Sequence, residues 1–188
     1  MNAVDTYSLP DLDQVWRWLD QVPDPEIPVI SLVDLGIIRE LHYDAGTLVV
    51  TVTPTYSGCP ATTIINRDIE SALRRHGIVD LRLERRLSPP WTTEWLSEKG
   101  RARLREYGIA PPDDSTAKVP AETVTAIPGQ RTIWLRQRAL VSTKTPTVSC
   151  PRCGSNHTEC VSQFGSTPCK ASYRCLRCLE PFDYFKCI

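Results

Sequence analysis

The sequence lacks several features that would assign it to large classes of protein. No stretch approaches the roughly 18 consecutive apolar residues of a membrane span, and the N-terminus has neither the basic nor the apolar region of a secretory signal. It has no glycine-rich fingerprint for a flavin or nicotinamide cofactor. Its three histidines are scattered, without the Glu-x-x-His pairs of a diiron carboxylate site. We therefore expect a cytoplasmic protein that carries out none of these cofactor chemistries itself.

Cysteine, by contrast, is concentrated at one end, with seven of the eight residues in the last 39. Four of them form two C-x-x-C pairs, Cys150 with Cys153 and Cys175 with Cys178, separated by residues 154–174. Because each tight turn points both sulfurs the same way, two pairs can close into a tetrahedron around one metal ion. In a cytosolic protein such clusters more often bind metal than form disulfides. The sequence predicts structural zinc here, although tetrahedral sulfur ligation also suits iron or a cluster.

The other cysteines of this segment have no such spacing. We assign no role to Cys160, whereas Cys169 and Cys187 form either a second thiol site or a pair of buried structural thiols. A segment of this length cannot bury enough apolar surface to fold unaided, so we expect metal ligation to supply most of its folding free energy.

The N-terminal region shows alternating helix and strand patterns. The predicted elements are a helix over 11–22, a hairpin over 36–43 and 47–54, a helix over 61–76, a strand over 79–87 and a helical segment over 93–107. This order predicts an α+β domain, a small sheet with helices packed on one face. We divide the chain into an α+β domain (1–110), a linker or insertion (111–148) and a zinc-ribbon-like domain (149–188).

One cysteine and three acidic residues of this domain are candidates for chemistry. Cys59 would lie at or next to the N-cap of the 61–76 helix, with Pro60 as the first helical residue, where the helix dipole favours a thiolate. A buried, inert cysteine is an equal alternative. Asp24, Glu26 and Asp34 lie in the irregular stretch before the hairpin. Turn formation is the alternative role for the two aspartates, and we favour it for Asp34.

Several stretches resemble known families. Asp-Pro-Glu-Ile-Pro-Val at 24–29, Asp-Leu-Gly at 34–36 and the Cys-Pro loop at 59–60 resemble the domain shared by SUF-system accessory protein T and the eukaryotic cytosolic iron-sulfur targeting proteins. That likeness covers about the first 88 residues. Four further stretches resemble the PaaD-like proteins of bacterial aerobic phenylacetate degradation, and they are 91–96, 107–112, 164–170 and 180–188. Residues 113–146 look like an insertion relative to that family.

The resemblance implies an accessory role in phenylacetyl-CoA epoxidation, as a maturation factor and not as an enzyme. Its partners would be the flavin and [2Fe-2S] reductase component, the diiron oxygenase component, or both, and its cargo would be transient iron or an iron-sulfur cluster. Cys59 matches the family's reactive cysteine, and Asp24, Glu26 and Asp34 match its acidic signature. A homodimer remains open.

Two other functions compete with maturation. The chain could be a non-catalytic structural subunit of the oxygenase complex. A nucleic-acid-binding ribbon is less favoured; it is suggested by nine basic against three acidic residues in 130–188, a net charge of +6. The aromatic side chains that would stack on bases are Tyr173, Phe182, Tyr184 and Phe185. We expect these four to form the core of the ribbon instead.

Overall fold

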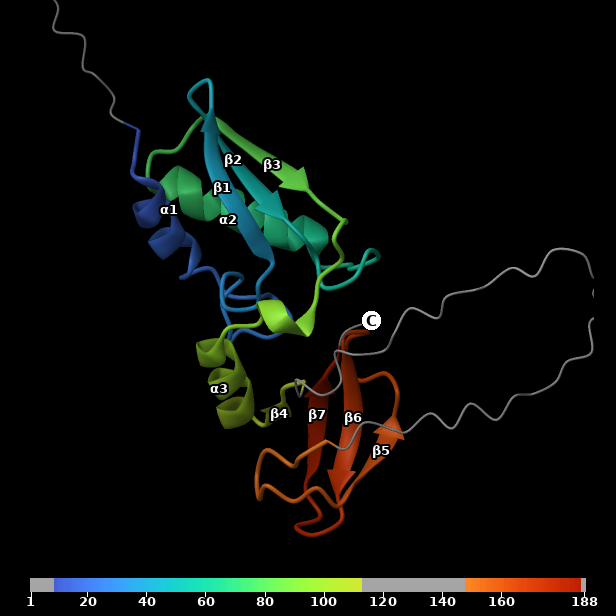
Figure 1. The fold of residues 1–188 in the computed structure, drawn as a ribbon. Coiled ribbons are helices and arrows are strands. Elements are labelled where there is room, and N and C mark those ends of the chain that lie inside the picture. The colour runs from blue at the N-terminus through green and yellow to red at the C-terminus, as the bar shows by residue number, and fades with distance from the viewer. Residues whose placement is uncertain (1–8, 113–147, 187–188) are drawn as a thin grey trace, which may run out of the picture.

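The computed structural model describes residues 9–112 and 148–186. Figure 1 shows two parts, an N-terminal sheet with helices and a C-terminal ribbon of strands, joined through helix α3 and a short strand. The predicted α-β-β-α-β order and the α+β class of the first part are confirmed.

The first helix is shorter than predicted. α1 spans Leu12–Leu19 and buries Val15 and Leu19 completely. The chain then leaves the helix before Val22, because the residue preceding Pro23 is disfavoured in helical conformation. A bridge between Pro23 and Ser31 closes the irregular 24–30 loop.

The hairpin and the third strand form one mixed sheet. β1 (Ile38–Asp44) and β2 (Thr47–Val52) pair antiparallel across a tight turn in which Ala45 and Gly46 both have positive φ. β3 (Leu81–Arg85) pairs parallel to β2, so the strand order is β1-β2-β3. The crossover between β2 and β3 is α2 (Thr62–Arg75), which lies along one face of the sheet beside α1 (Figure 1).

The strand prediction was partly wrong at its beginning. The strand predicted over 79–87 begins two residues later, so Val79 precedes β3 and is 81% exposed. Leu81 and Leu83 pack against the core and alternate with the exposed Arg82 and Glu84. Central strand β2 buries five of its six residues, which is the usual situation for a strand with partners on both sides.

The segment after the sheet leads directly into the ribbon. The predicted 93–107 helix is a 3₁₀ turn, η1 (Thr93–Trp95), followed by α3 (Glu98–Tyr107). The Ser97 hydroxyl accepts from Gly100 N–H and caps α3, and Gly108 ends the helix at φ 94°. β4 (Ile109–Ala110) follows at once.

The ribbon is an antiparallel meander that β4 extends. It contains β5 (Thr158–Ser162), β6 (Lys170–Cys175) and β7 (Pro181–Phe185), and β4 pairs parallel to β7, giving the order β4-β7-β6-β5. Phe185 is fully buried and meets Trp91 edge to face, with ring centroids 5.8 Å apart. The ribbon is therefore docked on the first domain by a shared sheet and a shared core.

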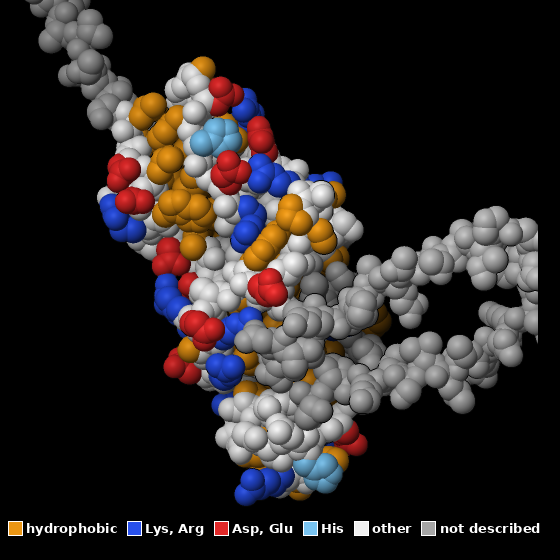
Figure 2. Space-filling model, viewed as in Figure 1, with side chains coloured by type: hydrophobic (Ala, Val, Ile, Leu, Met, Phe, Trp, Pro, Cys, Tyr) orange, Lys and Arg blue, Asp and Glu red, His pale blue; other side chains and the backbone are white. Residues whose placement is uncertain are grey.

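The surface offers little support for a nucleic-acid site. Figure 2 shows acidic and basic side chains intermingled on the visible face of the first domain. Of the nine basic residues in 130–188, four lie outside the described residues; five basic and three acidic residues remain in 148–186, a net of +2. All four ribbon aromatics are at most 7% exposed, as expected for a core. In the described ranges, no helix has the length and apolar character needed to cross a membrane.

Candidate metal centre and interdomain thiol site

The two C-x-x-C pairs fold into equivalent knuckles. In the first, Cys150 N–H donates to Ser155 O and Gly154 N–H donates to Cys150 O, both at 2.9 Å. In the second, Cys175 N–H and Leu179 N–H make the corresponding bonds, to Glu180 O and Cys175 O, both at 3.0 Å. The residue after each pair has positive φ, 69° at Gly154 and 65° at Leu179. The same backbone turn therefore presents both pairs of sulfurs.

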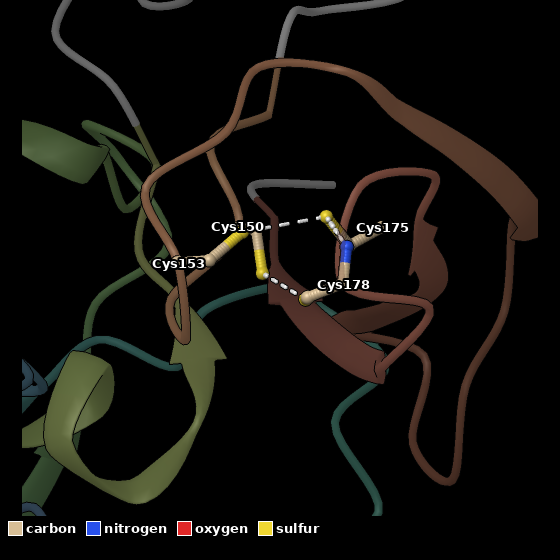
Figure 3. A group of neighbouring side chains, drawn as sticks. All are labelled: Cys150, Cys153, Cys175 and Cys178. Carbon is tan, nitrogen blue, oxygen red and sulfur yellow. Dashed lines mark hydrogen bonds between the residues drawn. The ribbon is translucent and has the colours of Figure 1, made fainter.

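The four sulfurs fit one tetrahedral ion. They lie within 4.8 Å of one another, and Figure 3 shows them facing a common centre. Cys150 Sγ lies 3.8 Å from Cys178 Sγ, and Cys153 Sγ lies 3.6 Å from Cys175 Sγ. A zinc–sulfur bond of about 2.3 Å gives a regular tetrahedron with edges of about 3.8 Å. The structure thus brings together the four residues that the spacing selected, in a geometry suited to zinc.

The electrostatics of the second pair favour ionisation of Cys175 before Cys178. The Cys178 backbone N–H contributes most to lowering the pKa of Cys175 to about 6. For Cys178, the Glu180 backbone N–H lowers the pKa, but burial and the neighbouring sulfurs outweigh it and raise the pKa to about 12. Ligation by a cation would remove the repulsion among the remaining thiolates, since metal binds the deprotonated form.

Cys59 lies close to the position predicted, but the local geometry differs. Ala61 is the N-cap and Thr62 the first helical residue, so Pro60 is not in the helix. The Cys59 carbonyl accepts from the Thr62 hydroxyl at 2.8 Å, which forms a separate turn before α2. Burial raises the pKa of the half-buried Cys59 thiol; the Ala61 N–H lowers it in part, and Glu26 raises it further. The backbone before the helix thus favours the thiolate, as predicted, but burial outweighs it.

Asp24 performs the turn function considered from the sequence. Its Oδ1 accepts the backbone N–H groups of Glu26 at 2.9 Å and Ile27 at 2.8 Å, which fixes the loop that carries Glu26. The side chain is only 5% exposed. Burial raises the pKa of Asp24, and the two N–H groups and Lys170 lower it in part. Asp24 thus positions Glu26 through the backbone.

Glu26 meets a cysteine of the ribbon that spacing alone did not connect to it. The Cys169 thiol donates to Glu26 Oε2 at 3.6 Å and lies 3.1 Å from the Thr167 hydroxyl. Cys169 is 4% exposed and belongs to the core of the first domain. Burial raises the pKa of the Cys169 thiol to about 11. The hydrogen bond with Thr167 lowers this pKa in part, and Glu26 raises it further.

A tyrosine hydroxyl lies near the contact between Cys169 and Glu26. Tyr56 lies on the loop before α2, and the pKa of its hydroxyl is raised to about 12, first by burial and then by Cys59, Glu26 and Cys169. Its oxygen is buried, and Cys59 is the side chain within reach of it. Tyr56, Cys59, Glu26 and Cys169 are therefore neighbours at the junction of the two domains.

The remaining candidates lie elsewhere. In place of the turn bond that we favoured for it, Asp34 faces the start of α3, where its Oδ1 accepts the Ser97 hydroxyl at 2.7 Å and its Oδ2 lies 3.1 Å from Lys99 Nζ. It is 5% exposed, and its contacts anchor α3 to the loop before β1. Cys160 lies on β5, the ribbon strand farthest from β4, and is paired with Tyr173 of β6. The predicted partner of Cys169, Cys187, lies outside the described residues.

Comparison with known proteins assigns both parts. A PaaD zinc beta ribbon domain matches residues 136–186, and an iron-sulfur cluster assembly protein domain matches residues 12–78. A protein of Escherichia coli (strain K12), whose name makes it one of the subunits of a 1,2-phenylacetyl-CoA epoxidase, is 42% identical over 190 residues and 100% of both chains. The chain belongs to the PaaD family. The resemblance found in the sequence is thereby confirmed over the full length.

Other proteins are similar to about half of this PaaD-family chain. An Fe-S protein maturation auxiliary factor of Porphyromonas gingivalis is 32% identical over 94 residues, which are 49% of this chain and 89% of that protein. The crystal structure of a domain of unknown function, DUF59, from Bacillus anthracis covers 49% of this chain and 89% of its own, with 26% identity and a TM-score of 0.46.

Proposed function

We propose that this protein is a maturation factor of a phenylacetyl-CoA epoxidase system and not itself a catalyst. It would assist delivery of iron or an iron-sulfur cluster to the reductase component, the oxygenase component, or both. The observation that carries this proposal is the match of residues 12–78 to an iron-sulfur cluster assembly protein domain, in which the charge of Glu26 reaches Cys59 and raises the pKa of its thiol. Thiolate and carboxylate are ligands that iron accepts.

Each of these residues has a separate role in this proposal. Cys59 and Glu26 handle the cargo, and Asp24 holds Glu26 in place through its two backbone hydrogen bonds. Asp34 supports the site indirectly by anchoring α3. The four ribbon cysteines would hold a structural zinc ion, since a closed set of four thiolates leaves no open position for chemistry.

The experiment compares epoxidase components produced with and without this protein. Iron, sulfide and flavin are measured in the purified reductase and oxygenase. Loss of the [2Fe-2S] content alone would assign cluster maturation, whereas loss of diiron content alone would assign iron insertion. Full loading of both components without this protein would reject maturation.

A variant pair then tests the role of Cys59. Cys59→Ser is expected to lower cofactor loading of the recipient, while Cys160→Ser, on the far strand of the ribbon, leaves it unchanged. Normal loading with Cys59→Ser would remove this thiol from the mechanism.

A structural subunit of the oxygenase complex is the second candidate, and the name of the Escherichia coli relative favours it. Copurification with the oxygenase in a fixed ratio would support this function. Fully active oxygenase that lacks the protein would exclude it.

A further inference from the structure

The strongest feature that the proposed function leaves unused is a positively charged side chain, Arg39, without an acidic partner. β1 carries one residue more than β2 between its pairs at Ile38 and Glu40, and Arg39 is that extra residue. A β-bulge of this kind re-aims a side chain. The guanidinium of Arg39 lies over the ring of Trp95, 3.5 Å from its centroid.

Trp95 is a fixed platform for this guanidinium. The turn η1, which contains Trp95, packs against Gly36, whose φ is 72°. A Cβ on Gly36 would lie 2.5 Å from the Trp95 carbonyl oxygen, so glycine is needed for this approach. Stacking uses the flat face of a guanidinium and leaves the N–H groups at its edge for acceptors. The edge of Arg39 is thus held in place for a ligand.

A second guanidinium lies next to Arg39. Arg86 follows β3, and its Nη2 is 3.0 Å from Oε2 of Glu40, the residue directly after Arg39. Burial, and then the charge of Arg86, lower the pKa of Arg39. Within residues 9–112 and 148–186, no carboxylate lies at ion-pair distance from Arg39. Two arginines therefore share one carboxylate, which leaves an excess of positive charge.

These arginines lie at one end of the sheet. β1 begins there, and the parallel strands β2 and β3 both end there. The Arg86 N–H donates to Val52 O at 2.9 Å, which places Arg86 beside the beginning of the loop after β2. Figure 2 shows basic and hydrophobic side chains next to one another on the visible face of this domain.

A partly apolar hollow adjoins the arginines at the same end. It has a volume of about 160 Å³ and lies between the loop after β2 and the segment after β3, with Tyr56, Pro90 and Trp91 among its walls. Leu87 directly follows Arg86, lines the hollow and is 44% exposed. The hollow has room for an apolar side chain of another protein.

The combination favours a protein segment over a small anion. A free anion on this open surface would gain only the two guanidinium groups, in competition with water. An acidic segment of a protein gains the same ion pairs together with apolar contacts in the hollow. Aromatic and arginine side chains, as in Trp91, Tyr56 and Arg39, are the types that contribute most to protein interfaces.

We propose that Arg39 and Arg86 bind a carboxylate of an acidic segment on an epoxidase component, while an apolar side chain of that segment enters the hollow. This inference rests on the proposed function for the identity of the partner. The Cys59 N–H donates to Tyr56 O at 3.3 Å, so one wall of the hollow and the candidate thiol belong to the same turn. The docked component would therefore lie beside Cys59.

The test is a calorimetric titration of the purified reductase and oxygenase components, each in turn, with the full-length zinc-loaded protein. We expect wild type to bind one component with an affinity that falls as salt is raised. Arg39→Gln should weaken this binding by about 10- to 100-fold, the contribution of a hydrogen bond to a charged group. Arg39→Lys should weaken it less, because lysine keeps the charge but cannot form two parallel N–H···O bonds.

Matched variants separate this site from a general effect of charge. Arg75→Gln removes the same charge from an exposed position at the end of α2 and should bind like wild type. Leu87→Ala should weaken binding without changing its salt dependence. Because Arg39 has no ion-pair partner among the described residues, Arg39→Gln should keep the wild-type circular dichroism and zinc stoichiometry.

Three results would overturn the docking surface. The first is binding of neither component by wild type. The second is equal binding by Arg39→Gln and Arg75→Gln. The third is binding of inorganic phosphate that depends on Arg39 while neither component binds, which would make a free anion the ligand.

The outcomes also distinguish this surface from the proposed function. If epoxidase loading requires the protein but Arg39→Gln binds and loads both components like wild type, maturation stands and the docking surface is rejected. If binding depends on Arg39 but the epoxidase is fully loaded without the protein, the surface stands and serves a function other than maturation.

Discussion

The equivalence of the two metal knuckles allows the cost of one backbone conformation to be measured twice in a single protein. Gly154 and Leu179 occupy the same position after their C-x-x-C pairs and have φ of 69° and 65°. A residue with a Cβ pays about 1–2 kcal/mol in this left-handed region. Glycine avoids this strain, but it destabilises the folded state by about 0.4–1 kcal/mol because it has greater conformational freedom in the unfolded chain. The net preference for glycine over alanine is therefore about 1 kcal/mol.

Three variants test this magnitude. A Cβ at Gly154 would meet no atom within 4 Å, so Gly154→Ala should cost about 1 kcal/mol through strain alone. Leu179 is 60% exposed, and comparing Leu179→Gly with Leu179→Ala removes the contribution of its side chain. The glycine variant should be the more stable by about 1 kcal/mol.

The assay is zinc competition with a chromophoric chelator, because folding of the ribbon is coupled to metal binding. A difference of about 1 kcal/mol corresponds to about fivefold in apparent zinc affinity. Equal affinities for the glycine and alanine variants at 179, or tighter binding by Gly154→Ala, would refute the assignment of a common strained turn.

Four further predictions follow from the packing and the charges. Phe185→Ala should lower the free energy of unfolding by about 3–5 kcal/mol and undock the ribbon, seen in tryptophan fluorescence, whereas Phe164→Ala at a 65% exposed site should change it little. Asp24→Asn keeps an acceptor oxygen for the turn. Because burial raises the folded-state pKa of Asp24 above 3.8, wild type should lose stability relative to this variant as pH rises above that value, and parallel pH profiles in urea would contradict this. Asp34→Ala should cost about 1–3 kcal/mol in urea unfolding, and an unchanged unfolding curve would contradict its role in anchoring α3. Chelation of the structural metal should abolish the near-ultraviolet circular dichroism of the ribbon aromatics and leave the helical signal of the first domain, whereas an unchanged aromatic signal would show that the ribbon folds without metal.

Local patterns determined most of the secondary structure and the metal centre. The two C-x-x-C pairs needed only their own tight turns to present sulfurs, so spacing alone identified Cys150, Cys153, Cys175 and Cys178. The helices and the hairpin followed from periodicity and turn residues. Errors occurred at their ends, as at Pro60, where the outcome depends on which carbonyl and hydroxyl groups close the turn.

The interdomain site was decided by tertiary structure. Nothing near Cys169 in the sequence indicates that it faces Glu26, since their contact depends on β4 pairing with β7 and on Phe185 packing against Trp91. Likewise, the acidic signature is one group in the sequence, but Asp24 closes its own turn, Glu26 contacts Cys169 of the ribbon and Asp34 faces α3. Side-chain chemistry can be predicted from residue type and spacing, whereas the partner of each side chain is set by contacts between distant segments, which only the packed fold defines.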